Sequence, residues 1–555
     1  MFIKALMQKI ANGGGQYQSL LAQNRARSQK YLARFSTFAK NHKFLCVFIT
    51  LYCVFLVAFS RYAPNFDDTW IWLKIIEGDS KEVWTSFRPQ IGRFYPLAFL
   101  DLLILMKIST SPYLFFGFNA LLFALFCIIY IKILELSNGK STLNSVIIAL
   151  LATSCGFVTV FFGICYAEKV QIIWLALFML FSLCVLHNPT HKNQLFGIIF
   201  LNIALYYKEP SFVAAFAFGV VLLIYAIQNR QRDLAKYAFC VILSSCYFVL
   251  LYYLLVVSEI NKAYSALVAK NLCVILWEYA LNDSLLPFGV GGILLWRIYC
   301  VAIKKARIEP FFDGLLAGSF AYFMAFIVLK MSAPYYLLPC FVFGIPALLY
   351  FSRKYFHNLF IKICLILGLF GFFTQNLPTG IYKMIDLKAQ GIQYHRTLDF
   401  VASYLSANQS VDIYFAGIGR GRDIYDFEVG MQPFWFADYL ERLHGIKDFD
   451  LRTNAPNGAN FHADKKSKFT LANSEIIGTP KMDDLIIVSN KGAFGDSLLV
   501  AGENGELVFK SGFHTIPYVA LVPLVQYVSA NYLGINLKNT NFFRMPTETY
   551  IFKAK

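Results

Sequence analysis

Two adjacent aspartates, Asp67 and Asp68, carry the strongest chemical signal in the sequence. They lie in the segment PNFDDTW (64–70), directly after the first long apolar run. Neighbouring carboxylates raise each other's pKa, which suits a general base, and they can also hold a divalent cation such as Mg²⁺ or Mn²⁺. The same residues would also serve as a solvated N-cap, with Asp67 starting a short helix through 72–76. The residue pattern leaves both interpretations open.

Two arginines follow in the same polar stretch. Arg88 and Arg93 stand in the segment RPQIGRFYPL (88–97), close to the next apolar run. Guanidinium groups bind phosphate oxygens in a bidentate manner, so the pair could hold a phosphorylated ligand. The alternative is that both side chains only reach from the lipid boundary into water.

Three further junctions between apolar runs carry polar or aromatic residues. Lys208 and Glu209 interrupt an almost continuous apolar stretch from 195 to 227, where charges usually mark a functional site. Glu168 belongs to the junction YAEK (166–169), where loop charge is the simpler interpretation. Tyr335 and Tyr336 follow another apolar run, and they could simply belong to the aromatic belt of a membrane protein.

Composition decides what kind of molecule must position these residues. The chain has 555 residues, of which 57% are hydrophobic and only 15% are charged, and its formal net charge is +17. Soluble proteins carry about 25% charged residues, so most of this chain must lie in a membrane. Residues 382–555 carry equal numbers of acidic and basic residues, so the positive excess lies among the apolar runs. There it indicates membrane topology and lipid contact rather than binding to nucleic acid.

The apolar runs predict a polytopic helical membrane domain at 44–381. Residues 1–43 are basic and lack acids, which predicts a cytoplasmic N-terminal segment. The run at 94–108 is short and charged, and placing it as an interfacial or re-entrant helix in an outer loop (61–112) brings every basic linker to the cytoplasmic side. This leaves about 11 spans and puts all four junctions on the outer side. The predicted spans are 44–60, 113–134, 143–162, 170–187, 195–207, 211–227, 237–257, 284–300, 311–329, 337–352 and 359–375.

The remaining segment, 382–555, predicts a soluble α/β domain on the outer face. Strands are expected at Val411–Ala416, Leu485–Ser489 and Glu506–Phe509, and helices at Thr397–Leu405 and Phe436–His444. The run Tyr518–Tyr527 is too short to span a membrane and is expected in the core of this domain. All 12 cysteines precede it, between positions 46 and 364, and are expected to be small core residues.

In order along the chain, these motifs resemble the GT-C superfamily of membrane glycosyltransferases. The likeness is to its aminoarabinose transferase and protein O-mannosyltransferase branch, over about residues 44–352. Asp67 and Asp68 match the acidic pair of the first outer loop, and RFYPL (93–97) is similar to a Lys-Pro-Pro-Leu-like motif. KEP (208–210) looks like a Lys-Gly-Pro element, and YLLP (336–339) looks like a Tyr-x-Leu-Pro element.

The resemblance implies transfer of a hexose or pentose from a polyprenyl-phosphate donor to a glycan, lipid or protein acceptor, with inversion. Asp67 would be the general base and Asp68 would orient it or hold a metal, for which Glu168 is the second candidate ligand. Arg93 and Lys208, with Arg88, would neutralise the departing phosphate, and Glu209, Tyr335 and Tyr336 would contact substrate.

The resemblance also implies a place in the cell and leaves alternatives open. It implies the inner (plasma) membrane, with a cytoplasmic N-terminus and a periplasmic C-terminal domain, and contact with membrane lipids. The alternatives are a transporter or flippase, and an O-antigen ligase or polymerase of cell-envelope glycan assembly. Transporters usually show paired repeats, which the sequence lacks, and a ligase would place its large outer loop between later spans.

Overall fold

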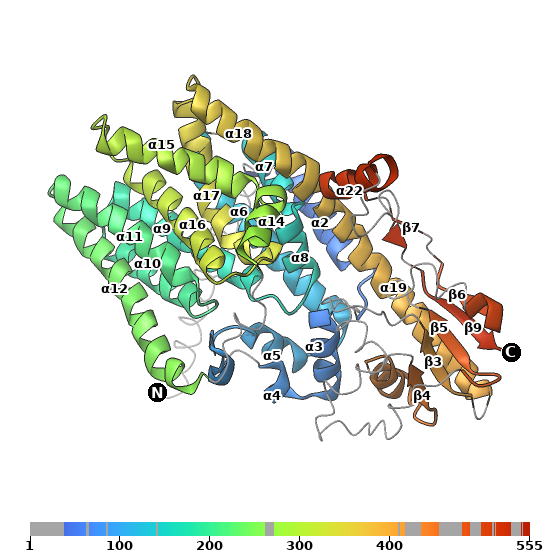
Figure 1. Ribbon diagram of the computed structural model, residues 1–555. Helices are drawn as coiled ribbons and strands as arrows, with labels where there is room; N and C mark the ends of the chain where they lie inside the picture. The colour runs from blue at the N-terminus through green and yellow to red at the C-terminus, as the bar shows by residue number, and fades with distance from the viewer. Residues whose placement is uncertain are drawn as a thin grey trace, which may run out of the picture.

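Apolar helices form the larger part of the computed structural model (Figure 1). The structure describes residues 38–62, 66–84, 87–139, 142–260, 271–408, 411–416, 435–453, 480–488, 501–512, 515–516, 518–533, 545–546 and 548–555. Most of the basic N-terminal segment therefore lies outside the described residues. The α-helices are α2 (Lys43–Val57), α3 (Phe66–Glu77), α4 (Ser80–Val83), α5 (Leu100–Met106), α6 (Pro112–Asn138), α7 (Thr142–Ala152), α8 (Cys155–Phe162), α9 (Glu168–His187), α10 (His191–Leu205), α11 (Ser211–Gln228), α12 (Arg232–Leu255), α14 (Leu272–Asn282), α15 (Gly291–Ala302), α16 (Pro310–Val328), α17 (Leu338–Lys354), α18 (Leu359–Gly371), α19 (Leu377–Ala407) and α22 (Leu521–Tyr532).

Shorter elements connect these helices. The 3₁₀ segments are η1 (Pro89–Ile91), η2 (Val257–Glu259) and η4 (Pro334–Leu337), and the π segments are η3 (Leu285–Val290), η5 (Phe372–Asn376) and η6 (Leu440–His444). The strands are β1 (Phe87–Arg88), β2 (Arg93–Phe94), β3 (Ile413–Ala416), β4 (Leu451–Thr453), β5 (Leu485–Val488), β6 (Gly505–Lys510), β7 (Thr515–Ile516), β8 (Met545–Pro546) and β9 (Tyr550–Ala554).

The polytopic membrane architecture expected from the sequence is present. Among the described residues, eight helices are long and apolar enough to cross a membrane, and nine if the bent pair α7–α8 counts as one span. The eleven predicted spans are these nine together with α2 and α10, which have 15 residues each. The predicted interfacial run at 94–108 contains only the seven-residue helix α5, which is too short to span.

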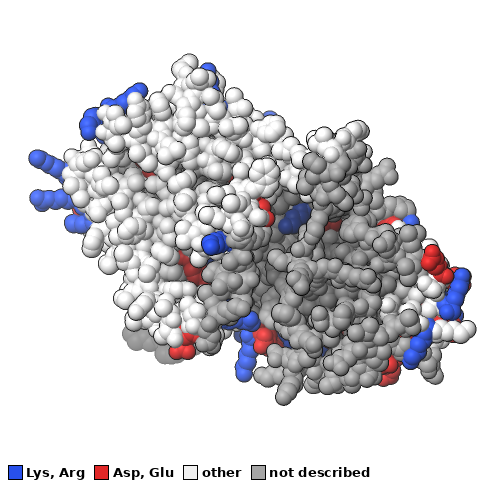
Figure 2. Space-filling view, viewed as in Figure 1, with Lys and Arg blue, Asp and Glu red and all other residues white. Residues whose placement is uncertain are grey.

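The charges on the surface follow the same arrangement. In Figure 2 the helical bundle is mostly white, and Lys and Arg gather at its upper-left edge. Figure 1 places the meeting point of α11 and α12 and the end of α15 at that edge. These are the sites of the basic linkers at 230–236 and 304–307, so the linkers lie at one end of the bundle.

A sharp bend separates α7 from α8 and is stabilised from a distant helix. The two helices meet at 66°, which frees backbone groups from the helical ladder. The Cys155 N–H donates to Asn376 Oδ1 at 3.1 Å. Gly380, in α19, lies so close to the Thr153 carbonyl that no side chain would fit. The long C-terminal helix is therefore fixed against the break.

The membrane part continues into the tail without a linker. Helices α18 and α19 are joined through η5 into one helical segment, Leu359–Ala407. The predicted domain boundary at 382 falls inside this segment, and the predicted helix Thr397–Leu405 is its last part. The C-terminal sheet region thus follows an extension of a helix that is long and apolar enough to cross a membrane (Figure 1).

The tail contains the expected α/β fold. Its five-stranded sheet has the order β4-β3-β5-β9-β6. Strand β3 is parallel to β4 and β5, with Ile413 opposite Leu485, whereas β9 is antiparallel to both β5 and β6. All three predicted strands are confirmed, as β3, β5 and β6. Ile413 and Leu485 are fully buried in the same core as Leu398 of α19, so this helix covers one face of the sheet.

Three sequence expectations fail in part. Most of the run at 518–527 lies in α22 and is not a core segment, because helical periodicity turns Leu524 and Val525 outward, where they are exposed. The cysteines are not all core residues, since Cys240, Cys246 and Cys273 are exposed on apolar helices; all twelve are unpaired thiols. Helix α14, which is short and apolar, was not expected. In a membrane protein apolar surface can face lipid, so hydrophobicity alone does not predict burial.

Candidate active site

A buried ion pair lies at the centre of the candidate site. Lys208, in the junction between α10 and α11, places its Nζ 2.8 Å from Glu168 Oε1, at the first residue of α9. The two side chains are 9% and 1% exposed. Burial lowers the pKa of Lys208, but the Glu168 carboxylate raises it, and the net direction is upward. Lys208 is therefore a charged ammonium group held inside the protein.

Aromatic rings surround this ammonium group. Lys208 Nζ lies 5.7 Å from the ring centroid of Tyr95 and 5.4 Å from that of Tyr336. Arg93 Cζ lies 5.2 Å from the same Tyr95 ring, so Tyr95 contacts both cations. The Tyr335 ring is 4.4 Å from Tyr336. Such contacts stabilise cations in a region with little water. The structure thus brings together Arg93, Lys208, Tyr335 and Tyr336, and their roles toward a substrate stay predictions.

A short hairpin covers the junction. In the antiparallel pair β1–β2, Arg88 is directly opposite Arg93. The Phe94 N–H donates to Glu209 Oε1 at 2.9 Å, and the Tyr252 hydroxyl donates to the Gly92 carbonyl, also at 2.9 Å. Glu209 therefore holds the hairpin in place through a backbone contact.

Arg88 does not reach the buried cluster. Its side chain is 45% exposed, and Nη2 lies 3.9 Å from Glu82 Oε2. Its guanidinium group lies 6.0 Å from the ring of Trp70. Although the two arginines are opposite each other in the hairpin, only Arg93 contacts Tyr95 beside Lys208.

Asp68 is buried and hydrogen-bonded to backbone. Its carboxylate accepts the Ile164 N–H at 3.0 and 3.1 Å and the Cys165 N–H at 3.0 Å. Burial raises the pKa of Asp68, and these hydrogen bonds partly offset that effect. Gly163 is required beside it, because a Cβ there would lie 3.1 Å from Asp68 Oδ2 and would collide with the Tyr166 ring. Asp68 therefore fixes the turn that leads into Glu168.

The neighbouring aspartate can be placed only by its backbone. Asp67 stands in the first turn of α3, next to Asp68. Its side chain lies outside the described residues, so its role as a general base stays a prediction. Because α3 begins at Phe66, both aspartates lie at the positive end of a helix, where carboxylates are favoured.

The described residues do not fit a metal site at Asp68 and Glu168. Within the described part of the chain, no group of three His, Cys, Asp or Glu side chains could hold a metal ion. The Asp68 oxygens accept backbone N–H groups, and Glu168 pairs with Lys208. These two carboxylates are thus engaged separately, Asp68 with backbone and Glu168 with Lys208.

Two residues of the site were missed by sequence reasoning. Tyr95 contacts both cations, and Lys169 donates to the Ile164 carbonyl at 2.7 Å, next to the turn held by Asp68. Both stand inside motifs singled out for their neighbours, Arg93 and Glu168. Tyr95 and Lys169 could have been found by considering every aromatic and cationic residue inside these motifs.

Comparison with solved structures finds two structures of ArnT among the matches. No family model matches this chain, and no curated protein sequence matches it. Two crystal structures of ArnT from Cupriavidus metallidurans, one in the apo state and one bound to undecaprenyl phosphate, each match with a TM-score of 0.41 and 12% identity. Each match covers 92% of this chain and 98% of that chain.

Proposed function

We propose that this chain is a membrane glycosyltransferase that takes a hexose or pentose from a polyprenyl-phosphate donor and transfers it to a glycan, lipid or protein acceptor. The reaction would take place at the outer face of the inner membrane, with the N-terminus in the cytoplasm. The single observation that carries the proposal is the pair of cations, Arg93 and Lys208, that share the Tyr95 ring at a junction between apolar helices.

The charges of the cluster suit a phosphate leaving group. When a glycosyl–phosphate bond breaks, the phosphate oxygen gains negative charge, and fixed cations in a site with little water stabilise that charge. Lys208 is paired with Glu168 in the free protein. A donor phosphate would compete with Glu168 for the ammonium group, so the ion pair keeps Lys208 charged and in place until the ligand arrives.

The aspartates take different parts in this proposal. Asp67 would remove the proton from the acceptor hydroxyl as the general base, which is the role implied by the motif. Asp68 would be a positioning residue, because its carboxylate holds the turn at 163–165 and leads into Glu168. Inversion follows if the acceptor attacks in line with the departing phosphate.

A transfer assay tests the proposal. The full chain in nanodiscs is supplied with a panel of radiolabelled polyprenyl-phosphate hexoses and pentoses, together with membrane extracts as acceptors. Asp67→Asn should lower the turnover number by about 10²–10⁴-fold, the usual contribution of a general base. The matched control is Glu82→Gln, an acid of the short helix α4 whose side chain is 51% exposed, and it should leave transfer unchanged. Full activity of Asp67→Asn would exclude the general-base role, and no transfer from any donor would exclude the donor class.

A further inference from the structure

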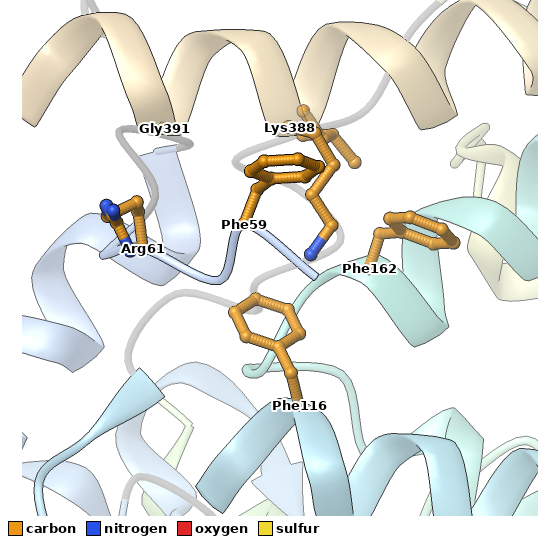
Figure 3. A pocket seen from close by; sticks show the side chains of 7 residues that line it. Phe59, Arg61, Phe116, Phe162, Lys388 and Gly391 are labelled. Atoms are coloured by element: carbon orange, nitrogen blue, oxygen red, sulfur yellow. The ribbon is translucent and has the colours of Figure 1, made fainter. Parts of the chain in front are cut away.

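A second cationic pocket lies where α19 crosses the ends of α2 and α8. Helix α19 contributes Lys388 on one side, and aromatic side chains from three other segments form the opposite walls (Figure 3). The pocket is a small hollow that is partly open to the surface. It is lined by Phe59, Arg61, Phe116, Phe162, Leu387, Lys388 and Gly391. None of these residues belongs to the cluster around Tyr95.

Lys388 is a buried lysine that forms no ion pair with a described carboxylate. Its side chain points between the aromatic rings (Figure 3), and the residue is only 8% exposed. Nζ donates to the Leu56 carbonyl, and it lies 4.5 Å from the ring centroid of Phe116 and 5.6 Å from that of Phe162. Among the described residues, no carboxylate forms an ion pair with it. Burying a charge without a counter-ion is costly, and aromatic rings offset only part of that cost.

A second cation lies at the same pocket. Arg61 follows α2, and its Nη1 donates to the Ser60 carbonyl at 3.0 Å and to the Tyr113 hydroxyl at 3.2 Å. Both of these hydrogen-bond acceptors are neutral, and Arg61 is exposed. The pocket thus combines one buried and one accessible cation, and the described side chains that line it include no acid.

The backbone beside Arg61 is strained in a way that builds the pocket. Phe59 has a φ of +56°, in the left-handed region that bulky residues rarely adopt. Such strain persists only where the surrounding structure imposes it, and it is concentrated at functional sites. Here the strained residue turns the chain out of α2 and contributes a wall of the pocket.

The surroundings of the pocket are apolar and exposed. Phe59 is 62% exposed and Tyr113 is 50% exposed. Ile385 and Ile381, which precede Lys388 by about one and two turns of α19, are 45% and 44% exposed. Exposed apolar side chains beside a spanning helix are suited to acyl or prenyl chains. Cations at the end of such a surface match the charge of a lipid phosphate.

We propose that this pocket binds the phosphate headgroup of a lipid, with Lys388 and Arg61 contacting the phosphate oxygens and the lipid chain lying along Ile381 and Ile385. The ligand supplies the counter-ion that the described residues lack. The shared chemistry is a phosphate on an apolar chain, which an outer-leaflet phospholipid and a polyprenyl phosphate both provide. The inference stands independently of glycosyl transfer.

Binding measurements on the full chain in detergent test the proposal. The probes are phosphatidylglycerol, a polyprenyl phosphate, inorganic phosphate and diacylglycerol, and the readouts are native mass spectrometry and thermal protection. Phosphatidylglycerol or polyprenyl phosphate should bind and protect, diacylglycerol should not, and the better of the two phosphorylated lipids identifies the source. Inorganic phosphate that protects as well as either lipid would overturn the lipid proposal in favour of a free anion.

Two variants and a matched control locate the site. Lys388→Met keeps the volume of the side chain and removes its charge, and it should weaken lipid binding at least tenfold. Arg61→Gln lies at an exposed position, so it should fold, and it should weaken binding in the same direction. The control is Lys362→Met, because Lys362 also lies over a ring, that of Phe356 at 5.3 Å, but outside the pocket. Wild-type lipid affinity in both pocket variants would overturn the proposal, and because the readout is binding, failure of the transfer assay leaves this test intact.

Discussion

Lys208 and Lys388 are both buried lysines at the end of the bundle where α8 leads into α9, yet their surroundings differ. Lys208 pairs with Glu168 at 2.8 Å, whereas Lys388 donates to a backbone carbonyl between two phenylalanine rings. In the first site the Glu168 carboxylate is the counter-ion of Lys208. The described residues that line the second site include no acid. A buried lysine can therefore have its counter-ion within the chain, as Lys208 does, or can take one from a ligand, as we propose for Lys388.

Breaking the Glu168–Lys208 ion pair should cost the most stability. Glu168→Gln would leave Lys208 as an unpaired buried charge, and removing one partner of such a pair costs about 3–5 kcal/mol. The measurement is the thermal midpoint of the purified protein in detergent. The control is Glu309→Gln, whose pair with Lys354 is at the surface, with side chains 30% and 39% exposed. That variant should cost about 0–1 kcal/mol.

A double variant separates stability from function at the same site. Glu168→Leu combined with Lys208→Met replaces the ion pair with apolar side chains, and such replacements are often neutral or stabilising. It should recover most of the stability lost in Glu168→Gln and still lack transferase activity. A Glu168→Gln variant no less stable than Glu309→Gln would show that the two lysine sites do not differ in this way.

The turn at 163–165 joins the two sites and is held by Asp68. Asp68 holds Ile164 and Cys165, between Phe162 of the lipid-phosphate pocket and Glu168 of the ion pair. Asp68→Ala would leave two buried N–H groups without an acceptor, at a cost of about 1–3 kcal/mol. Asp68→Asn keeps one acceptor oxygen and should cost less. Lipid protection and transfer activity should both fall in Asp68→Ala, and a loss confined to one readout would show that the sites are independent.

A site can be predicted from sequence when the residues that reveal it stand close together along the chain. Lys208 interrupts an apolar stretch, so its importance is visible in the sequence itself. Lys388 stands in a mixed polar segment, and its burial depends on Leu56, 332 residues away. Its other contacts, Phe116 and Phe162, also come from distant parts of the sequence. No local pattern records such contacts, and the pocket could be found only in the folded structure.

The same distinction between local and distant contacts explains which elements of the fold could be predicted from sequence. Strands β3 and β5 are short apolar runs bounded by turn residues, so they could be predicted from their own residues. The continuity of α18 with α19 could not, because π segment η5 carries polar residues, Gln375 and Asn376, that usually indicate the end of a span. Asn376 is instead buried, and it donates to the Asn282 carbonyl at 2.6 Å and accepts from Cys155. Tertiary hydrogen bonds replace the polar boundary that the sequence suggests.

The smallest expected effect tests the hairpin that covers the Lys208 site. Glu209 accepts the Phe94 N–H at 2.9 Å, and a glutamine carbonyl in its place could accept the same hydrogen bond. Glu209→Gln should therefore be close to neutral for stability, whereas Glu209→Ala should lose about 1 kcal/mol, the usual net value of one hydrogen bond. Thermal midpoints of the two variants give the comparison. The contacts described for Lys388 do not involve this hairpin. The lipid affinity of the Lys388 pocket should therefore stay at the wild-type value in both variants. A large loss of stability in Glu209→Gln would mean that the charge of Glu209, and not its hydrogen bond, supports the site, and Glu209 would then belong to the same charge balance as Glu168.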